Sequence, residues 1–497
     1  GTGISSGGAL RNISGDNSYA GAITLAAATL INSDSGNLTL SGIISGSNSL
    51  TKNGSGTLTL SGANSYTGTT TINAGTLKFQ ANTFNATSRN YTITSGAVLN
   101  LDGANKFAGG NSTISGAGKL LITGGQFQGQ ATASPAVVGN ISLGSGGTIE
   151  IASGATLYNG GYTSVFWTSN LADIIVDGTL NVADGRTVIV DALTGSGTID
   201  KTISDGTVNL LVGVDNGTGT FSGIIKNTTG SIALTKNGTG TQTLSGNNTY
   251  SGTTTINAGT LEVGASGRLG AGSYAQNITN NGTLIYSGTN AQTLSGIISG
   301  TGNLTQNASS TLTLAGNSNF NGATTINAGT LVLSGTNTAS AITVASGGTL
   351  MGTGSGGATT VSGTPELRDG HDLLNTLRGT APQRDALIGL YGTPGTRHFK
   401  CMVRQGDWKY IWLANGGREL LFNLRLDATE SRSLVPHEPA VLASLRAHAI
   451  SVLSSRELTQ PAVAHGALLA LPFAPFPRVR IKQFARGVTD FGQGPTS

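Results

Sequence analysis

Three segments of the chain repeat one another closely, and this repetition constrains the fold more than any other feature. Residues 50–79 read LTKNGSGTLTLSGANSYTGTTTINAGTLKF, and residues 234–263 match them at 23 of 30 positions. Residues 304–333 match the first copy at 18 of 30 positions, and a degenerate relative lies at residues 13–30. Self-similarity on this scale is typical of stacked architectures in which each unit contacts only its neighbours.

Within one copy the residue pattern predicts short β-strands. Residues 57–60 and 76–79 alternate polar and apolar side chains, and residues 70–72 are β-branched throughout. Such runs favour strands with one buried face. The side chains expected to point inward are Leu58, Leu60, Ile72, Leu77 and Phe79. Leu58 and Leu77 are 19 residues apart, enough for three short strands and three turns, so the spacing predicts about one coil of a parallel β-helix.

The composition agrees with a stacked solenoid. Only 10% of the 497 residues are charged, and 77 are glycine. In stacked coils each residue lies about 4.8 Å from its counterpart, so a charge in every coil would form a repulsive column. Thr, Ser and Asn columns can instead form hydrogen bonds along the stack. Glycine is expected where turns pack on turns, and Gly and Asn are expected to supply positive φ in segments 61–65 and 73–75.

The whole-chain averages of charge and glycine content hide two segments of different composition. Residues 1–364 hold 11 Lys and Arg against 12 Asp and Glu, whereas the remaining 133 residues hold 16 against 11. All five His, the one Cys and ten of the eleven Pro lie in the second segment, and 65 glycines lie in the first. This shift predicts two domains, residues 1–363 and 364–497, with the boundary near 354–365.

Several classes of protein are excluded. No apolar run approaches the roughly 20 residues of a transmembrane helix, so no membrane span is expected. One cysteine excludes a disulfide framework. The basic character belongs to the second segment, so no nucleic-acid partner is expected for the long neutral body.

The repeats also resemble a known family. The string LTKNGSGTLTLSGANSYTGTTTINAGTL is similar to the passenger-associated transport repeat of Gram-negative autotransporters, and similar residues extend across most of 1–363. The resemblance implies a right-handed β-helical passenger that is secreted through the outer membrane to the cell surface. Such passengers are commonly adhesive and often lack catalysis in the helix itself. The resemblance also implies a signal peptide and a C-terminal translocator barrel, neither of which is found in these 497 residues.

The second segment is predicted to be a small α+β domain with an antiparallel sheet and one or two helices. Residues 372–378 predict a short helix, residues 398–404 and 408–413 predict a hairpin, and residues 419–424 predict a third strand. Residues 439–453 predict the longest helix, which begins at a proline. Its apolar face is expected to hold Leu442, Leu445, Ala449 and Leu453.

This segment resembles the C-terminal subdomain of sulfatases. The similar strings are DGHDLLNTLRG at 369–379, CMVRQGDWKYIW at 401–412 and GGRELLFNLRLDATESRSLV at 416–435. In that family the nucleophile is a formylglycine made in a C/S-x-P-x-R motif within the larger catalytic domain. Cys401 is followed by Met-Val-Arg-Gln, and no serine heads the motif. No catalytic, cofactor-binding or metal-binding residue, and no cofactor, is therefore expected.

The other candidate residues receive structural interpretations. Cys401 is predicted to be a small buried side chain. The histidines (His371, His398, His437, His448 and His465) lack metal-ligand spacing. Trp408, Tyr410 and Trp412 alternate on one strand, which permits a carbohydrate platform but favours packing against the helix. The basic string at 478–482 is interpreted as a solvated strand. The glycine-rich string at 352–357 is interpreted as a chance result of the high glycine content.

Three functional interpretations follow. The first is a non-catalytic surface passenger, adhesive or structural, with an unknown extracellular ligand. The second is a fragment of a sulfatase whose catalytic domain lies outside these residues. The third is a recent or artefactual fusion of two unrelated segments.

Overall fold

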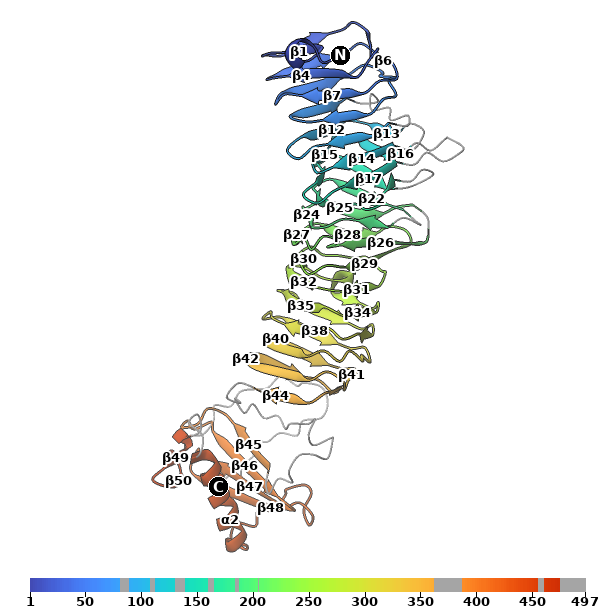
Figure 1. Ribbon diagram of the computed structural model, residues 1–497. Helices are drawn as coiled ribbons and strands as arrows, with labels where there is room; N and C mark the ends of the chain where they lie inside the picture. Colours follow the sequence, from blue (N-terminus) through green and yellow to red (C-terminus); the bar gives the residue numbers. More distant parts are fainter. Residues whose placement is uncertain are drawn as a thin grey trace. The chain divides into compact units, whose positions relative to one another are not determined.

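The computed structural model describes residues 1–80, 89–107, 112–129, 139–159, 165–183, 187–203, 205–361, 387–454 and 460–473. The chain divides into two compact units, residues 1–365 and 366–497 (Figure 1). The first unit is an all-β solenoid of stacked parallel strands. The predicted helix at 372–378, His371 and the basic string at 478–482 lie outside the described residues.

The strand register confirms the predicted coil. Strand β8 (Thr57–Leu60) pairs in parallel with β10 (Thr76–Phe79), which places Leu58 beside Leu77 and Leu60 beside Phe79. All five side chains predicted to point inward are fully buried. The solenoid interior is a single continuous hydrophobic cluster that extends from Leu25 to Val344. The right-handed sense of the coils stays a prediction.

The strands of the solenoid form long parallel sheets. The eight-stranded sheet contains β1 (Leu10–Asn12), β4 (Thr29–Ser33), β7 (Leu50–Asn53), β9 (Thr70–Ile72), β11 (Tyr91–Ile93), β14 (Ser112–Gly116), β17 (Gly139–Leu143) and β20 (Val165–Phe166). The nine-stranded sheet contains β2 (Asn17–Tyr19), β5 (Asn37–Leu40), β8, β10, β12 (Val98–Asp102), β15 (Lys119–Thr123), β18 (Thr148–Ile151), β21 (Asp173–Val176) and β24 (Leu193–Thr194).

Two six-stranded sheets lie further along the chain. One contains β13 (Asn105–Phe107), β16 (Gln126–Gly129), β19 (Thr156–Asn159), β22 (Thr179–Val182), β25 (Thr198–Lys201) and β28 (Ile224–Asn227). The other contains β23 (Val188–Ile189), β26 (Thr207–Val212), β29 (Ser231–Lys236), β31 (Thr254–Ile256), β34 (Ile278–Asn280) and β37 (Ile298–Ser299).

The remaining coils form an eleven-stranded sheet and two small pairs. The large sheet contains β27 (Gly219–Phe221), β30 (Thr241–Leu244), β32 (Thr260–Ala265), β33 (Ser273–Tyr274), β35 (Thr283–Gly288), β36 (Gln292–Leu294), β38 (Asn303–Gln306), β39 (Thr311–Leu314), β40 (Thr324–Leu333), β42 (Ile342–Met351) and β44 (Thr359–Val361). The pairs are β3 (Ile23–Thr24) with β6 (Ile44–Ser45), and β41 (Thr336–Asn337) with β43 (Ser355–Gly356). Of two short 3-10 segments, η1 (Ile4–Ser6) precedes β1 and η2 (Gly270–Gly272) lies between β32 and β33.

Glycine allows the turns of successive coils to touch. A Cβ atom on Gly62 would lie 2.3 Å from the carbonyl oxygen of Gly42, and one on Gly42 would lie 2.2 Å from that of Gly21. The expectation that turns pack on turns through glycine is therefore confirmed. The predicted positive φ is confirmed at Gly75, which has a φ of +61°. It is wrong for segment 61–65, where no residue has a positive φ and Gly62 is needed only for the close approach.

The second unit has a four-stranded antiparallel sheet and one long helix. The sheet order is β45 (Leu387–Tyr391), β46 (Lys400–Gln405), β47 (Trp408–Leu413) and β48 (Arg418–Asn423). Helix α2 (Pro439–Ser454) buries the four predicted side chains, Leu442, Leu445, Ala449 and Leu453. The remaining elements are η3 (Gln460–Ala462) and a hairpin of β49 (Val463–Ala464) and β50 (Ala467–Leu468).

The predicted hairpin and third strand of this unit are confirmed, with shifts of one or two residues at their ends. Strand β45 and the small hairpin were not predicted. In the part of the chain that the structure describes, no helix has the length and apolar character needed to cross a membrane.

Candidate functional site: the outward face of the solenoid

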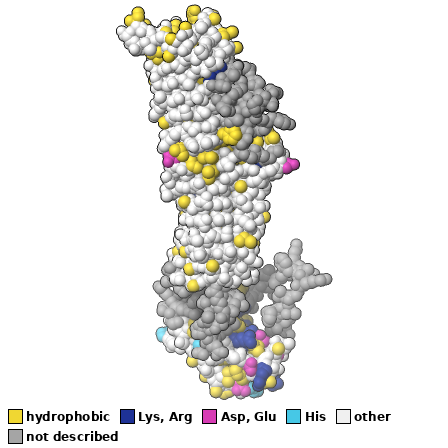
Figure 2. All heavy atoms as spheres, turned by 45° about the vertical axis from the view of Figure 1, so that its right-hand side comes forward, with side chains coloured by type: hydrophobic (Ala, Val, Ile, Leu, Met, Phe, Trp, Pro, Cys, Tyr) yellow, Lys and Arg dark blue, Asp and Glu magenta, His cyan; other side chains and the backbone are white. Residues whose placement is uncertain are grey.

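The outward face of the solenoid carries many polar side chains that bind one another between coils, beside a few exposed apolar ones such as Ile43 and Ile297. The Thr59 hydroxyl donates to Asn37 Oδ1 at 2.7 Å, and the Thr123 hydroxyl donates to Asn100 Oδ1 at 2.8 Å. Because these partners lie in adjacent coils, the expected hydrogen bonding along the stack is confirmed. Figure 2 shows how few charged side chains interrupt this surface on the face in view.

One such contact recurs in all three close copies of the repeat. The amide of Asn73 donates to Asn53 Oδ1 at 2.9 Å. The equivalent pairs are Asn257 with Asn237 at 2.8 Å and Asn327 with Asn307 at 3.3 Å. These asparagines occupy the same two positions of the 30-residue repeat, so the repeat encodes a fixed surface contact between its own two coils.

The few charged residues of the solenoid also pair between coils. The salt bridges described are Arg11–Asp34 at 2.7 Å, Lys78–Asp102 at 2.8 Å, Lys119–Glu150 at 2.8 Å and Lys226–Asp200 at 3.1 Å. Each joins opposite charges, so neighbouring coils avoid the like-charge columns that stacking would otherwise create.

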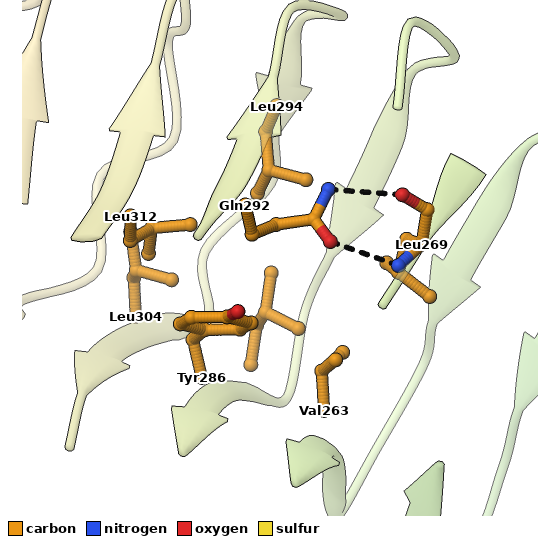
Figure 3. Close-up of a pocket in the computed structure, with 8 residues that line it drawn as sticks. Val263, Leu269, Tyr286, Gln292, Leu294, Leu304 and Leu312 are labelled. Carbon is orange, nitrogen blue, oxygen red and sulfur yellow. Dashed lines mark hydrogen bonds between the residues drawn. The ribbon is translucent and has the colours of Figure 1, made fainter. Parts of the chain in front are cut away.

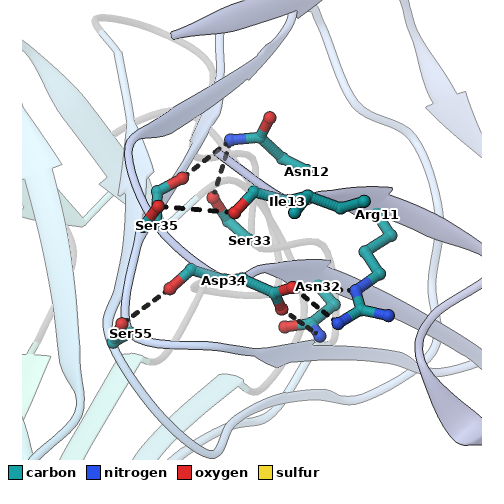
Figure 4. Close-up of polar contacts among 8 residues, drawn as sticks. All are labelled: Arg11, Asn12, Ile13, Asn32, Ser33, Asp34, Ser35 and Ser55. Atoms are coloured by element: carbon teal, nitrogen blue, oxygen red, sulfur yellow. Dashed lines mark hydrogen bonds and ion pairs between the residues drawn. The ribbon is translucent and has the colours of Figure 1, made fainter. Parts of the chain in front are cut away.

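The first coils show how these contacts combine (Figure 4). The Asp34 carboxylate accepts from Arg11 Nε at 2.8 Å and from Asn32 Nδ2 at 2.7 Å. The Ser55 hydroxyl, one coil further along, donates to the backbone carbonyl of Asp34 at 2.7 Å. On the neighbouring side, Asn12 Nδ2 donates to Ser35 O at 3.0 Å. Most of these polar groups are paired within the cluster, although Asn32 Oδ1 is buried without a partner, and the contacts hold successive coils together.

Sequence analysis missed a buried lysine inside the repeat. Lys52 is fully buried because the register aligns it with Ile72, an inward-facing position. Its Nζ donates to Asn53 O at 2.8 Å, Gly54 O at 2.8 Å and Ala74 O at 3.1 Å. Burial lowers the pKa of Lys52 to about 8, because the apolar interior disfavours the charged form.

The same position holds a buried donor in the other two copies. Lys236 Nζ donates to the carbonyl oxygens of Asn237 and Gly238, and burial lowers its pKa as well. In the third copy Gln306 Nε2 donates to Ala308 O at 3.2 Å and Ser310 O at 2.8 Å. The repeat thus requires an inward N–H donor that binds turn carbonyls, and either an ammonium or an amide serves.

A small void lies in the solenoid core (Figure 3). The Gln292 side chain accepts from the Leu269 backbone N–H at 2.8 Å and donates to Leu269 O at 3.0 Å, so it substitutes for a strand neighbour. The other lining residues are Val263, Leu284, Tyr286, Leu294, Leu304 and Leu312. A volume of about 10 Å³ leaves room for at most one water molecule, so this void is a packing feature and too small for a ligand.

In the second unit, two of the predicted interpretations are confirmed. Cys401 is fully buried in the sheet, and burial raises the pKa of its thiol to about 12. Tyr410 and Trp412 are buried in the core beneath α2, and Trp408 packs partly buried against the same core. Packing, and not an exposed platform, therefore explains the alternating aromatic residues.

A polar triad joins the helix to the sheet of this unit. Arg446 of α2 donates from Nε to Glu419 Oε1 at 2.6 Å, and Tyr410 Oη donates to the same oxygen at 2.7 Å. The hydrogen bonds from Arg446 and Tyr410 hold the pKa of the Glu419 carboxyl below its ordinary value, although burial opposes this shift. Because the Glu419 carboxylate is paired with Arg446, the triad has a structural role.

The described residues hold no cluster of three or more His, Cys, Asp and Glu side chains that could bind a metal ion. A groove of about 400 Å³ is lined by Gln405, Trp408, Ala440, Val441, Ser444 and Leu445. None of these six side chains titrates near neutral pH, so the groove offers no acid or base.

Comparison with known proteins agrees with the architecture. A family model described as passenger-associated-transport-repeat matches residues 12–31, 50–79, 234–263, 304–333 and 328–351. A segment of 197 residues is 32% identical to an adhesin, the BmaC autotransporter of Brucella suis biovar 1 (strain 1330). The match covers 38% of this chain and 5% of that protein. The chain therefore carries repeats of the passenger-associated-transport type and is similar to an autotransporter adhesin, and these similarities indicate secretion to the cell surface through the outer membrane.

Proposed function

We propose that the chain is a non-catalytic adhesive segment of a surface passenger. The observation that carries this proposal is the outward face of the stacked coils, on which Thr and Asn side chains recur and the same Asn pair is repeated in each close copy of the repeat. A ligand that repeats on a similar spacing would meet many weak contacts at once, and such multivalent binding gives high avidity without a deep pocket. The similarity to an adhesin supports the same function.

The test compares monomeric and clustered protein. Purified full chain, in solution and coupled densely to beads, is incubated with cultured epithelial cells and with arrays of extracellular matrix proteins and glycans. The proposal expects strong adhesion of the beads and weak binding of the monomer, because avidity depends on simultaneous contacts. Bead adhesion no greater than that of albumin-coated beads would contradict the proposal.

We propose in addition that residues 364–497 are a sulfatase-like C-terminal subdomain without catalytic function. A small antiparallel sheet with one packed helix supports this assignment, as does the run of similar strings from 369 to 435. The formylglycine motif does not occur in the 497 residues. Incubation of the full chain with 4-nitrophenyl sulfate and calcium is expected to release no nitrophenol above buffer, and metal-dependent release would favour the sulfatase-fragment alternative.

A further inference from the structure

Helix α2 covers only one face of the four-stranded sheet in the second unit. The buried residues Cys401, Tyr410 and Leu421 face the helix, so the alternate residues of the same strands face away from it. On that outer face the register aligns three rows across the strands. The middle row is apolar and contains Gly389, Met402, Ile411 and Leu420. On one side of it lies a row that includes Arg404 and Lys409. On its other side lies a row of Tyr391, Lys400, Leu413 and Arg418.

The last of these rows combines cations with exposed aromatic rings. Lys400 Nζ lies 5.3 Å from the ring centre of Tyr391, whose surface is 69% exposed. At the other end, the Arg418 guanidinium lies 5.5 Å from the ring centre of Phe473, which is 61% exposed. We call Tyr391, Lys400, Leu413, Arg418 and Phe473 the basic–aromatic row.

The positive charge of this row is not neutralised within the described part of the chain. Neither Lys400 nor Arg418 forms an ion pair with a described carboxylate, whereas Lys409 in the other basic row binds Glu430 at 2.6 Å. Glu419 is a neighbour of Arg418 in sequence, but its carboxylate binds Tyr410 and Arg446 on the helix side of the sheet. Among the residues that the structure describes, the row therefore presents two cations without a carboxylate partner, each beside an exposed aromatic ring.

We propose that the basic–aromatic row binds an anionic membrane surface. Lys400 and Arg418 would meet lipid phosphates, and Tyr391 and Phe473 would enter the headgroup region, where amphipathic and apolar rings are favourably placed. The exposed rings of Tyr391 and Phe473 stand at the two ends of the row beside the cations. This arrangement suits a broad charged surface better than the enclosed contact that an acidic protein segment would need. The proposal is independent of the adhesive function of the solenoid.

Vesicle flotation of the full chain tests the proposal. We expect the chain to float with phosphatidylglycerol/phosphatidylcholine vesicles, to lose this binding as salt is raised, and to stay unbound with phosphatidylcholine alone. The double variant Lys400→Glu/Arg418→Glu should bind at least about tenfold more weakly, because each cation near an anionic surface contributes to attraction. The variant Tyr391→Ser/Phe473→Ser should still bind the anionic vesicles at low salt. It should lose the part of the vesicle binding that the native chain retains at moderate salt.

The matched control is Arg404→Glu/Arg432→Glu, which changes the net charge equally at exposed residues outside the basic–aromatic row. This variant should bind vesicles like the native chain, and unchanged circular dichroism should verify that each variant folds. Equal loss in both charge variants would show attraction by net charge alone and overturn the proposal. Absence of vesicle binding by the native chain, or binding to immobilised polyglutamate instead of vesicles, would overturn it too.

Discussion

At the scale of single residues, the repeat is specified by its inward donors as much as by its apolar residues. Lys52, Lys236 and Gln306 occupy one position of the repeat, and each donates to backbone carbonyls of a turn beside the core. A buried unpaired carbonyl is costly, which explains why a lysine or glutamine stands where an aliphatic residue would seem to suit the core.

Substitution of Lys52 tests this role. Lys52→Met keeps the volume but leaves the carbonyls of Asn53, Gly54 and Ala74 without their donor, so we expect a loss of about 1–3 kcal/mol in the free energy of unfolding. Lys52→Gln restores the donor used by Gln306 and should cost less than about 1 kcal/mol. Urea denaturation of the three proteins measures the difference. A methionine variant as stable as the glutamine variant would remove the argument for a required donor.

The lowered pKa of Lys52 gives this site a pH dependence. The pKa of Lys52 is about 8 in the folded protein and 10.5 in the unfolded chain. Between these pH values, Lys52 therefore binds more protons in the unfolded chain than in the folded protein. The free energy of unfolding should then rise as the pH increases from 8 to 10.5. This gain in stability should be lost as the pH falls back through 8. The difference in unfolding free energy between the native chain and Lys52→Gln isolates this slope from other groups. A difference that stays flat over this range would contradict the lowered pKa.

At the scale of elements, coils stack because the turns can touch. The glycines Gly21, Gly42 and Gly62 bring successive turns so close that no Cβ atom fits between them. The strands then align in register, and the asparagine and threonine contacts between coils follow from that alignment. Hydrogen bonds on the surface and apolar burial inside are therefore two consequences of one stacking geometry.

Gly62→Ala should separate two coils. Its Cβ would lie 2.3 Å from the Gly42 carbonyl oxygen, so the backbone must shift, and we expect a loss of about 2 kcal/mol or more. Gly144→Ala is the matched control, because its Cβ would lie 3.8 Å from the nearest atom and its φ is ordinary. Thermal unfolding followed by circular dichroism compares them, and equal midpoints for the two variants would argue against turn contact as the stacking constraint.

Much of the solenoid could be predicted from local pattern, and the rest depends on pairing between distant residues. The alternation around Leu58 and Leu77 fixed both the inward side chains and the coil length. Lys52 could not be placed, because a lysine in a polar run is expected in solvent and only its alignment with Ile72 shows that it points inward. In the second unit, Cys401 was correctly placed by its apolar strand, whereas the basic–aromatic row emerged only from the register of β45 to β48.

At the scale of the whole molecule, the two units have different surfaces. The solenoid pairs several of its few charges between coils and presents a mainly uncharged outward face, whereas the second unit concentrates cations and exposed aromatic rings in one row. The proposed adhesive function uses the first surface, and the proposed contact with an anionic membrane uses the second.

The stacking register is the basis of the entire account, and one distance tests it directly. Thr57 and Thr148 lie in one outward column of β8, β10, β12, β15 and β18. Spin labels at these positions, introduced as Thr57→Cys/Thr148→Cys with Cys401→Ala, should lie about 19 Å apart by pulsed electron resonance, since four coil steps separate them. A single narrow distribution near this value is the predicted result. A broad distribution, or one centred beyond about 30 Å, would contradict the stacked solenoid.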